Sequence, residues 1–163
     1  MAKNKEEKTN VMRVLEQKKI AYTAHTYPHE EGVAVDGVTV AKSMGFDPAI
    51  VFKTLVARGA SKQYYVFDVP VAENLDLKKA AKAVGEKSIE MIHQKELLPL
   101  TGYVHGGCSP VGMKKLFPTV FHETAENLET MIVSAGKIGY QVELSPRDLA
   151  ALVRAKFADI IVE

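Results

Sequence analysis

The chain has 163 residues, of which 47% are hydrophobic and 25% charged, a composition typical of a globular protein with a sizeable core. Its formal net charge of +1, from 21 basic and 20 acidic residues, excludes a uniformly basic nucleic-acid-binding protein and leaves only a local patch for that role. One cysteine, a charged N-terminus and the absence of an apolar run of roughly 18 residues predict a cytoplasmic protein without internal disulfides, signal peptide or membrane helix.

The elements predicted for the first half of the chain are marked by capping residues, β-branched runs and the prolines or glycines that end them. They are a flexible segment at residues 1–8, a helix capped by Thr9 or Asn10, a strand at 21–27, a loop at 30–37, a helix at 39–44, and hairpin strands at 51–57 and 63–69. The hairpin is the strongest of these signals, because both arms are rich in β-branched and aromatic residues and a glycine-containing turn lies between them.

The second half of the chain contains shorter elements. They are a helix from Asp76 to Val84, a helix at 93–98, strands at 103–107, 119–122, 130–134 and 139–144, and a helix from Ser145 to about Lys156. Strands mixed with short helices, without strict alternation, favour an α+β fold or a mixed, curled sheet over a doubly wound one. We see no linker, so residues 1–163 are predicted to form one domain.

Lys53 is the first residue that could carry chemistry, because it interrupts the apolar run at residues 50–56. On a strand it shares a face with Val51 and Leu55. A lysine in this pattern is either solvated at an outer face or sheet edge, or it contacts a phosphate or carboxylate in a cleft. The pattern by itself favours the solvated lysine.

A glycine-rich loop at residues 106–112 is the second feature. Glycines let the backbone approach a ligand closely and direct N–H groups at an anion or a developing oxyanion. The two glycines at 107 and 112 have nearly the spacing of a phosphate-binding P-loop, but Met113 stands where that loop requires lysine and Pro110 lies inside it. A nucleotide triphosphatase is therefore excluded, and an ordinary tight turn is the alternative to a ligand-binding loop.

Cys108 lies in this loop, three residues after His105, and invites a Cys–His nucleophile. A strand would direct His105 away from the thiol, so we predict that Cys108 only packs. His25 and His29 have metal-ligand spacing for a helix, but their segment is predicted to be a strand, so no metal site is expected. From pattern alone, Ser134 belongs to a hairpin turn.

Several short motifs, taken in order, resemble the YbaK family. They are His25-Thr26-Tyr27 and residues 51–55, 75–80, 102–115, 133–137 and 155–160. YbaK proteins are free-standing editing domains related to the insertion domain of bacterial prolyl-tRNA synthetases. The resemblance implies a mixed, β-barrel-like sheet surrounded by helices, and hydrolysis of Cys-tRNA(Pro) without cofactor or metal. It implies the tRNA(Pro) acceptor end as partner, with prolyl-tRNA synthetase as a candidate protein partner.

The same resemblance implies the site residues. Lys53 would hold the tRNA 3′ end, Gly106 and Gly107 would lie against the reacting ester, and the pocket would be lined by Tyr27, Thr54 and Ser134. Many relatives carry an aspartate where this chain has Gln141, which would then contact the substrate. The implied mechanism needs no protein nucleophile, because the thiol of the cysteine substrate attacks its own ester carbonyl.

The sequence leaves two alternatives open. Gln141 and the loop at residues 30–37 depart from the family, so a sibling deacylase that removes another small amino acid from tRNA(Pro), such as alanine, is one alternative. A non-catalytic module that binds a tRNA end or a synthetase is the other. The lysines that would form a local tRNA patch, or else simply face solvent, are Lys78, Lys79, Lys82, Lys114, Lys115 and Lys137.

Overall fold

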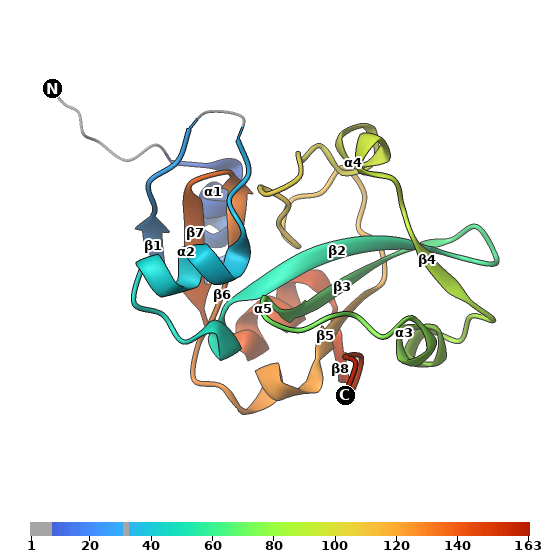
Figure 1. Cartoon of the computed structure of the whole chain (residues 1–163). Helices are drawn as coiled ribbons and strands as arrows, with labels where there is room; N and C mark the ends of the chain where they lie inside the picture. Colours follow the sequence, from blue (N-terminus) through green and yellow to red (C-terminus); the bar gives the residue numbers. More distant parts are fainter. Residues whose placement is uncertain (1–7, 31–32) are drawn as a thin grey trace, which may run out of the picture.

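The computed structural model describes residues 8–30 and 33–163 (Figure 1). The helices of this part are α1 (Asn10–Gln17), α2 (Gly37–Ser43), α3 (Leu77–Val84), α4 (Gln94–Thr101) and α5 (Pro146–Val153), with short 3-10 helices η2 (Pro48–Ile50) and η3 (Glu123–Asn127). The strands are β1 (Tyr22–Thr26), β2 (Phe52–Gly59), β3 (Tyr64–Pro70), β4 (Ile89–Met91), β5 (Thr119–His122), β6 (Met131–Lys137), β7 (Tyr140–Leu144) and β8 (Lys156–Ala158). Among the described residues, no helix has both the length and the apolar character needed to span a membrane.

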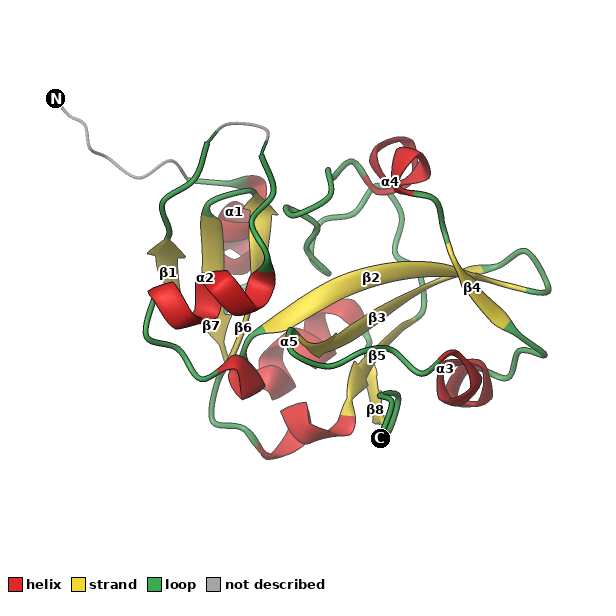
Figure 2. Ribbon diagram, viewed as in Figure 1, coloured by secondary structure: helices red, strands yellow, loops and turns green. Residues whose placement is uncertain are grey.

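The strands form two sheets. Strands β1, β7 and β6 make an antiparallel sheet in that order, and β4, β2, β3, β5 and β8 make a mixed sheet in which β5 runs parallel to both neighbours. A parallel bridge between Val51 and Ile132 joins the start of β2 to β6, so the two sheets meet at this point. Figure 2 shows the sheets side by side with the helices around them, which confirms the α+β class.

The main core lies between the sheets and helices α1 and α5, where Leu15, Phe121, Met131, Leu144 and Leu149 are almost fully buried. Each such side chain stabilises the fold by about 1.5–3 kcal/mol. The core holds the two sheets in a fixed relation, so the side chains at their junction keep a defined geometry.

The strongest local signals of the sequence are confirmed. The hairpin of β2 and β3 pairs in continuous register, and Thr9 caps α1 by accepting a 3.3 Å hydrogen bond from the Met12 N–H. Asp76 caps α3 by accepting from the N–H groups of Lys78 and Lys79, both at 3.0 Å. The first seven residues of the predicted flexible segment at 1–8 lie outside the described residues, and its last residue, Lys8, forms an ion pair with Glu16.

Several boundaries differ from the prediction. Residues 103–107 form a turn instead of a strand, because Gly106 has a φ of +89° and the Gly107 N–H donates to the Val104 carbonyl at 3.0 Å. Helix α5 ends at Val153, since Arg154 adopts a left-handed conformation with φ of +58°. Strand β6 continues to residue 137 through a bulge. The three-residue strands β4 and β8 were missed, because such short strands exist only through pairing with β2 and β5.

Candidate active site

A cavity of about 530 Å³ opens where the two sheets meet. Its walls are the first half of β2, the ends of β6 and β7 that form their hairpin, the start of α2 and the loop at residues 105–108. Six of the seven residues predicted for the site line it: Tyr27, Lys53, Thr54, Gly106, Ser134 and Gln141. Gly107 does not line it. The tertiary structure thus brings together residues from four separate segments of the chain.

Lys53 lies half-buried near the start of β2. Burial lowers the pKa of its ammonium, while the carboxylates of Asp36 and Glu73 raise it. Among residues 8–30 and 33–163, no group forms a hydrogen bond or ion pair with this ammonium. The cavity therefore contains a cationic donor that is free to bind a phosphate or a carbonyl oxygen of a ligand.

Ser134 and Gln141 face each other across the β6–β7 pair, which places both side chains on the cavity side. The Ser134 hydroxyl accepts a 3.1 Å hydrogen bond from the Gly136 N–H, so its own proton is available to a ligand. Gln141 is only 8% exposed, and its Oε1 has no hydrogen-bond partner within the described residues. A donor and an acceptor are thus presented together on one wall.

The two glycines of the loop have different roles. A Cβ on Gly106 would lie 2.7 Å from the Cβ of Ala34, and its φ is positive, so this position requires glycine. Within the described part of the chain, the Gly106 N–H has no acceptor. Gly107 is buried against the backbone of Lys137 and Ile138, and its N–H already donates to Val104. An oxyanion-binding role therefore remains a prediction for Gly106, while Gly107 supports the loop by close packing.

Cys108 lines the cavity but is buried. Burial, and then the nearby Asp68 carboxylate, raise the pKa of its thiol to about 12. A thiol with this pKa stays protonated at neutral pH and is a poor nucleophile. The loop does bring His105 to the same cavity, contrary to the strand expectation, but the protonated thiol still argues against a Cys–His nucleophile.

Replacing Cys108 by alanine is therefore expected to keep the activity within about threefold and to lower the free energy of unfolding by about 1 kcal/mol, through the lost packing of one sulfur. Urea unfolding measures the change in stability, and an assay of the deacylation that the family resemblance implies measures the change in activity. An activity loss of a hundredfold would instead identify the thiol as a nucleophile.

Asp68 is a polar residue that the sequence reasoning missed. It lies on β3 opposite Thr54 and is 0% exposed. Thr54 Oγ1 donates to Asp68 Oδ1 at 2.5 Å. Burial raises the pKa of the Asp68 carboxyl to about 7, although the Thr54 hydrogen bond opposes that shift. The sequence does contain a signal for this residue, because Asp68 interrupts the otherwise apolar hairpin strand at residues 64–69.

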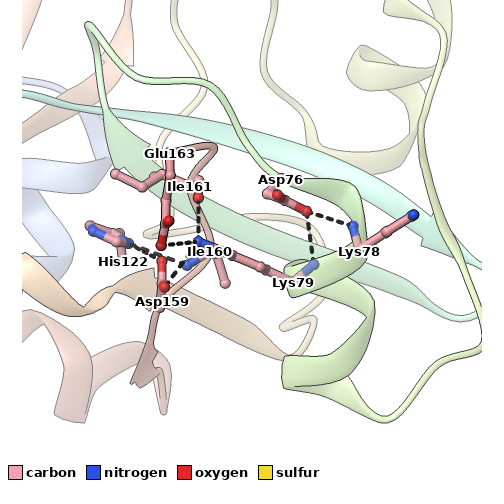
Figure 3. Close-up of polar contacts among 8 residues, drawn as sticks. All are labelled: Asp76, Lys78, Lys79, His122, Asp159, Ile160, Ile161 and Glu163. Atoms are coloured by element: carbon pink, nitrogen blue, oxygen red, sulfur yellow. Dashed lines mark hydrogen bonds and ion pairs between the residues drawn. The ribbon is translucent and has the colours of Figure 1, made fainter.

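Two histidines and one lysine that the sequence analysis singled out are bonded to other groups of the chain. His25 Nε2 contacts Glu143 Oε1 at 2.8 Å, and His29 Nδ1 contacts the Tyr27 carbonyl at 2.8 Å. Of the lysines proposed for a basic patch, Lys79 is held by the C-terminal segment (Figure 3): its ammonium lies 3.0 Å from Asp159 and 3.2 Å from Glu163. These carboxylates compensate its charge, which removes Lys79 from the predicted patch.

Comparisons with known proteins show the family of the chain. Residues 32–152 match the family model of the aminoacyl-tRNA editing domain. The chain is similar to a predicted Cys-tRNA(Pro)/Cys-tRNA(Cys) deacylase, EbsC, of Enterococcus faecalis (strain ATCC 700802 / V583). The two sequences are 45% identical over 161 residues, which cover 98% of each protein.

Two solved structures have the same fold. One is a predicted trans-editing enzyme for prolyl-tRNA synthetase, with a TM-score of 0.79 and 25% identity over 94% of this chain and 95% of that one. The other is a hypothetical protein with a TM-score of 0.82 and 20% identity over 93% of this chain and 99% of that one, a likeness of fold alone. The family model covers most of the chain and the curated relative nearly all of it, so this protein belongs to the aminoacyl-tRNA editing, or YbaK, family.

Proposed function

We propose that this protein hydrolyses the ester bond of Cys-tRNA(Pro), acting in trans in the cytoplasm. Family membership supports an aminoacyl-tRNA substrate, and the names of EbsC and of the trans-editing structure support cysteine and tRNA(Pro). The observation that carries the proposal is the composition of the cavity. It contains the Lys53 ammonium, hydrogen-bonding groups and a glycine loop, whereas its one thiol is protonated.

Such a cavity suits a substrate that brings its own nucleophile. The sulfur of the cysteinyl group attacks the ester carbonyl carbon, and the C–S bond forms as the C–O bond to the ribose breaks. The thiol proton passes to the departing ribose oxygen, so the first products are a cyclic thioester and tRNA with a free hydroxyl. Water then opens the cyclic thioester to free cysteine, which completes the net hydrolysis. The protein contributes by holding the sulfur and carbonyl in a reactive geometry and by stabilising the negative charge on the carbonyl oxygen.

The described residues divide these tasks. Lys53 binds the phosphate or ribose at the tRNA 3′ end, and the free N–H of Gly106 donates to the developing oxyanion. Tyr27, Ser134 and Gln141 hold the aminoacyl group, with the Gln141 Oε1 as an acceptor that still lacks a donor. The cavity volume lies in the range that encloses small ligands, which fits an aminoacyl group at the end of the tRNA.

The test compares Cys-tRNA(Pro) with Ser-tRNA(Pro) on one transcript, with spontaneous hydrolysis subtracted. We expect the cysteinyl ester to be cleaved at least about a hundredfold faster, because a thiol is partly ionised near neutral pH and a hydroxyl of similar size is not. Serine is no larger than cysteine, so exclusion by size cannot produce this difference. Equal rates would contradict the substrate-thiol mechanism and favour an activated water.

The same assay separates the alternatives. Rapid cleavage of Ala-tRNA(Pro) would assign the sibling specificity, and binding of tRNA without turnover of any ester would identify a non-catalytic module. Cys-tRNA(Cys) is included because the name of EbsC contains it. Similar rates on both tRNAs would show that the tRNA body is not read by this chain, and would leave selection to a partner such as prolyl-tRNA synthetase.

A further inference from the structure

The buried pair Asp68–Thr54 lies just behind the cavity. Thr54 lines the cavity from β2, and Asp68 lies directly opposite it on β3, in a strand whose neighbouring residues Phe67 and Val69 are fully buried. Among the described residues, the Asp68 carboxyl accepts one hydrogen bond, from the Thr54 hydroxyl, and its Oδ2 has no partner. A carboxyl buried in this way is unfavourable for stability, so its presence requires an explanation other than packing.

The hydrogen bond determines what Thr54 offers to a ligand. A hydroxyl has one proton to donate and two lone pairs that accept. Since Asp68 Oδ1 lies 2.5 Å from Thr54 Oγ1, the hydroxyl proton points away from the cavity, to β3. Thr54 lines the cavity, and a ligand group that reaches its oxygen meets lone pairs alone. Without Asp68 the hydroxyl could rotate and present its proton, which would repel a donor on the ligand.

We infer that Asp68 is a positioning residue for the deacylation, which acts through Thr54 by keeping its oxygen oriented as a hydrogen-bond acceptor for a donor on the bound aminoacyl end. This inference rests on the proposed function. Two groups of the substrate offer such a donor near the ester: the α-ammonium and the neighbouring ribose 2′-hydroxyl. Asp68 itself does not line the cavity, so its effect on the substrate passes through the hydroxyl of Thr54.

A purely structural role of Asp68 predicts a different effect of its replacement on Tm. If Asp68 were kept for stability, replacing it would lower Tm. If it is kept for positioning, removing a buried ionisable group should raise Tm or leave it unchanged at pH 8, while kcat/KM falls. Leucine has the branched shape of aspartate but no acceptor atom, so Asp68→Leu separates the two roles.

The experiment is a double-mutant cycle of Asp68→Leu and Thr54→Val, assayed with the aminoacyl-tRNA that the wild type cleaves fastest. Each single variant is expected to lower kcat/KM about tenfold, the effect of one lost positioning hydrogen bond. In the Thr54→Val background, Asp68→Leu is expected to change kcat/KM less than about twofold, because both changes remove the same contact. Thr54→Ser, which keeps a hydroxyl, should stay within about threefold of wild type.

The matched control is Glu143→Gln. Glu143 accepts a 2.5 Å hydrogen bond from the Thr130 hydroxyl, which makes a threonine–carboxylate pair in a part of the fold that does not line the cavity, and Glu143 also contacts His25 Nε2 at 2.8 Å. The kcat/KM of the Glu143→Gln variant should equal that of the wild type.

Three outcomes would each overturn the inference. They are additive losses of kcat/KM in the cycle, a lower Tm of Asp68→Leu together with its lower rate, and an unchanged rate of Asp68→Leu. If Asp68→Leu fails to fold, equal rates of Thr54→Val and wild type would overturn it instead.

A substrate that ends in 2′-deoxyadenosine distinguishes the two donors. A tenfold effect of Thr54→Val that persists on this substrate assigns the donor to the α-ammonium, and one that disappears assigns it to the 2′-hydroxyl. The proposed function fails separately: wild-type protein that cleaves another ester but not Cys-tRNA(Pro) contradicts the substrate assignment, and the cycle is then measured on the ester that is cleaved.

Discussion

Replacing Lys53 by alanine is expected to lower kcat/KM for deacylation about a hundredfold while the fold is kept. The Lys53 ammonium lines the cavity and is bonded to no other group in the described part of the chain, so its binding capacity is available to the substrate. A positioned charged donor in a partly dry site contributes an effect of this order to the reaction rate. The side chain is only half-buried, and β2 pairs through its backbone, so the hairpin does not depend on it.

Lys82→Ala is the control for a general charge effect, because Lys82 is an exposed lysine on α3 that belongs to the predicted basic patch and does not line the cavity. Figure 1 shows α3 near β4, at the opposite end of β2 from the cavity. Initial rates on Cys-tRNA(Pro) and thermal unfolding are measured for both variants. A Lys53→Ala protein with wild-type kcat/KM would remove Lys53 from the site. A loss shared equally by Lys82→Ala would point to a general effect of charge on tRNA binding.

The stability of the protein is expected to depend on pH through Asp68. Its folded-state pKa, raised to about 7 by burial, lies above the ordinary value near 3.8 of the unfolded chain. The folded state therefore holds a proton that the unfolded state releases, so this contribution is fully present below about pH 4 and is lost as pH rises to about 7. The loss over this window is about 4 kcal/mol.

Other groups titrate too: the pKa values of Glu143 and Asp159 are lowered by their hydrogen bonds to Thr130 and Lys79, respectively, and these groups stabilise the fold as pH rises. The comparison with Asp68→Asn isolates Asp68, because asparagine has the same shape and does not ionise. The free energy of unfolding of this variant, relative to wild type, should rise by about 3 kcal/mol between pH 5 and pH 8. Urea unfolding measures it, and a constant difference would show that Asp68 does not titrate in this range.

At this site, stability and activity are expected to oppose each other. A substitution at Asp68 that stabilises the protein and slows the reaction would show that the buried carboxyl is retained for its effect on Thr54 and not for the fold. The Cys108 thiol next to it shows the opposite case. Its raised pKa makes it unreactive, and its contribution is to fill space beside the cavity.

The sequence by itself determined the elements whose signals are local, and through an ordered set of motifs it identified the family. The β2–β3 hairpin, the Thr9 and Asp76 caps and the interruption of an apolar strand by Lys53 depend on residues close together in the chain, so they could be predicted. Strand β8 could not, because three residues become a strand only when β5 is beside them.

Only the tertiary structure decided which side chains meet at the candidate site. The Thr54–Asp68 hydrogen bond depends on the register of β2 against β3, and the Ser134–Gln141 pair depends on the register of β6 against β7. The sequence pattern of a single strand does not determine which residue of another strand lies opposite it. The different roles of Gly106 and Gly107 follow from a turn where a strand had been predicted. The pKa of Cys108 depends on burial and on a carboxyl forty residues earlier in the chain. Burial and neighbouring charges shift a pKa, and both are supplied by segments that are distant in the sequence. The pKa of such a group therefore depends on the fold.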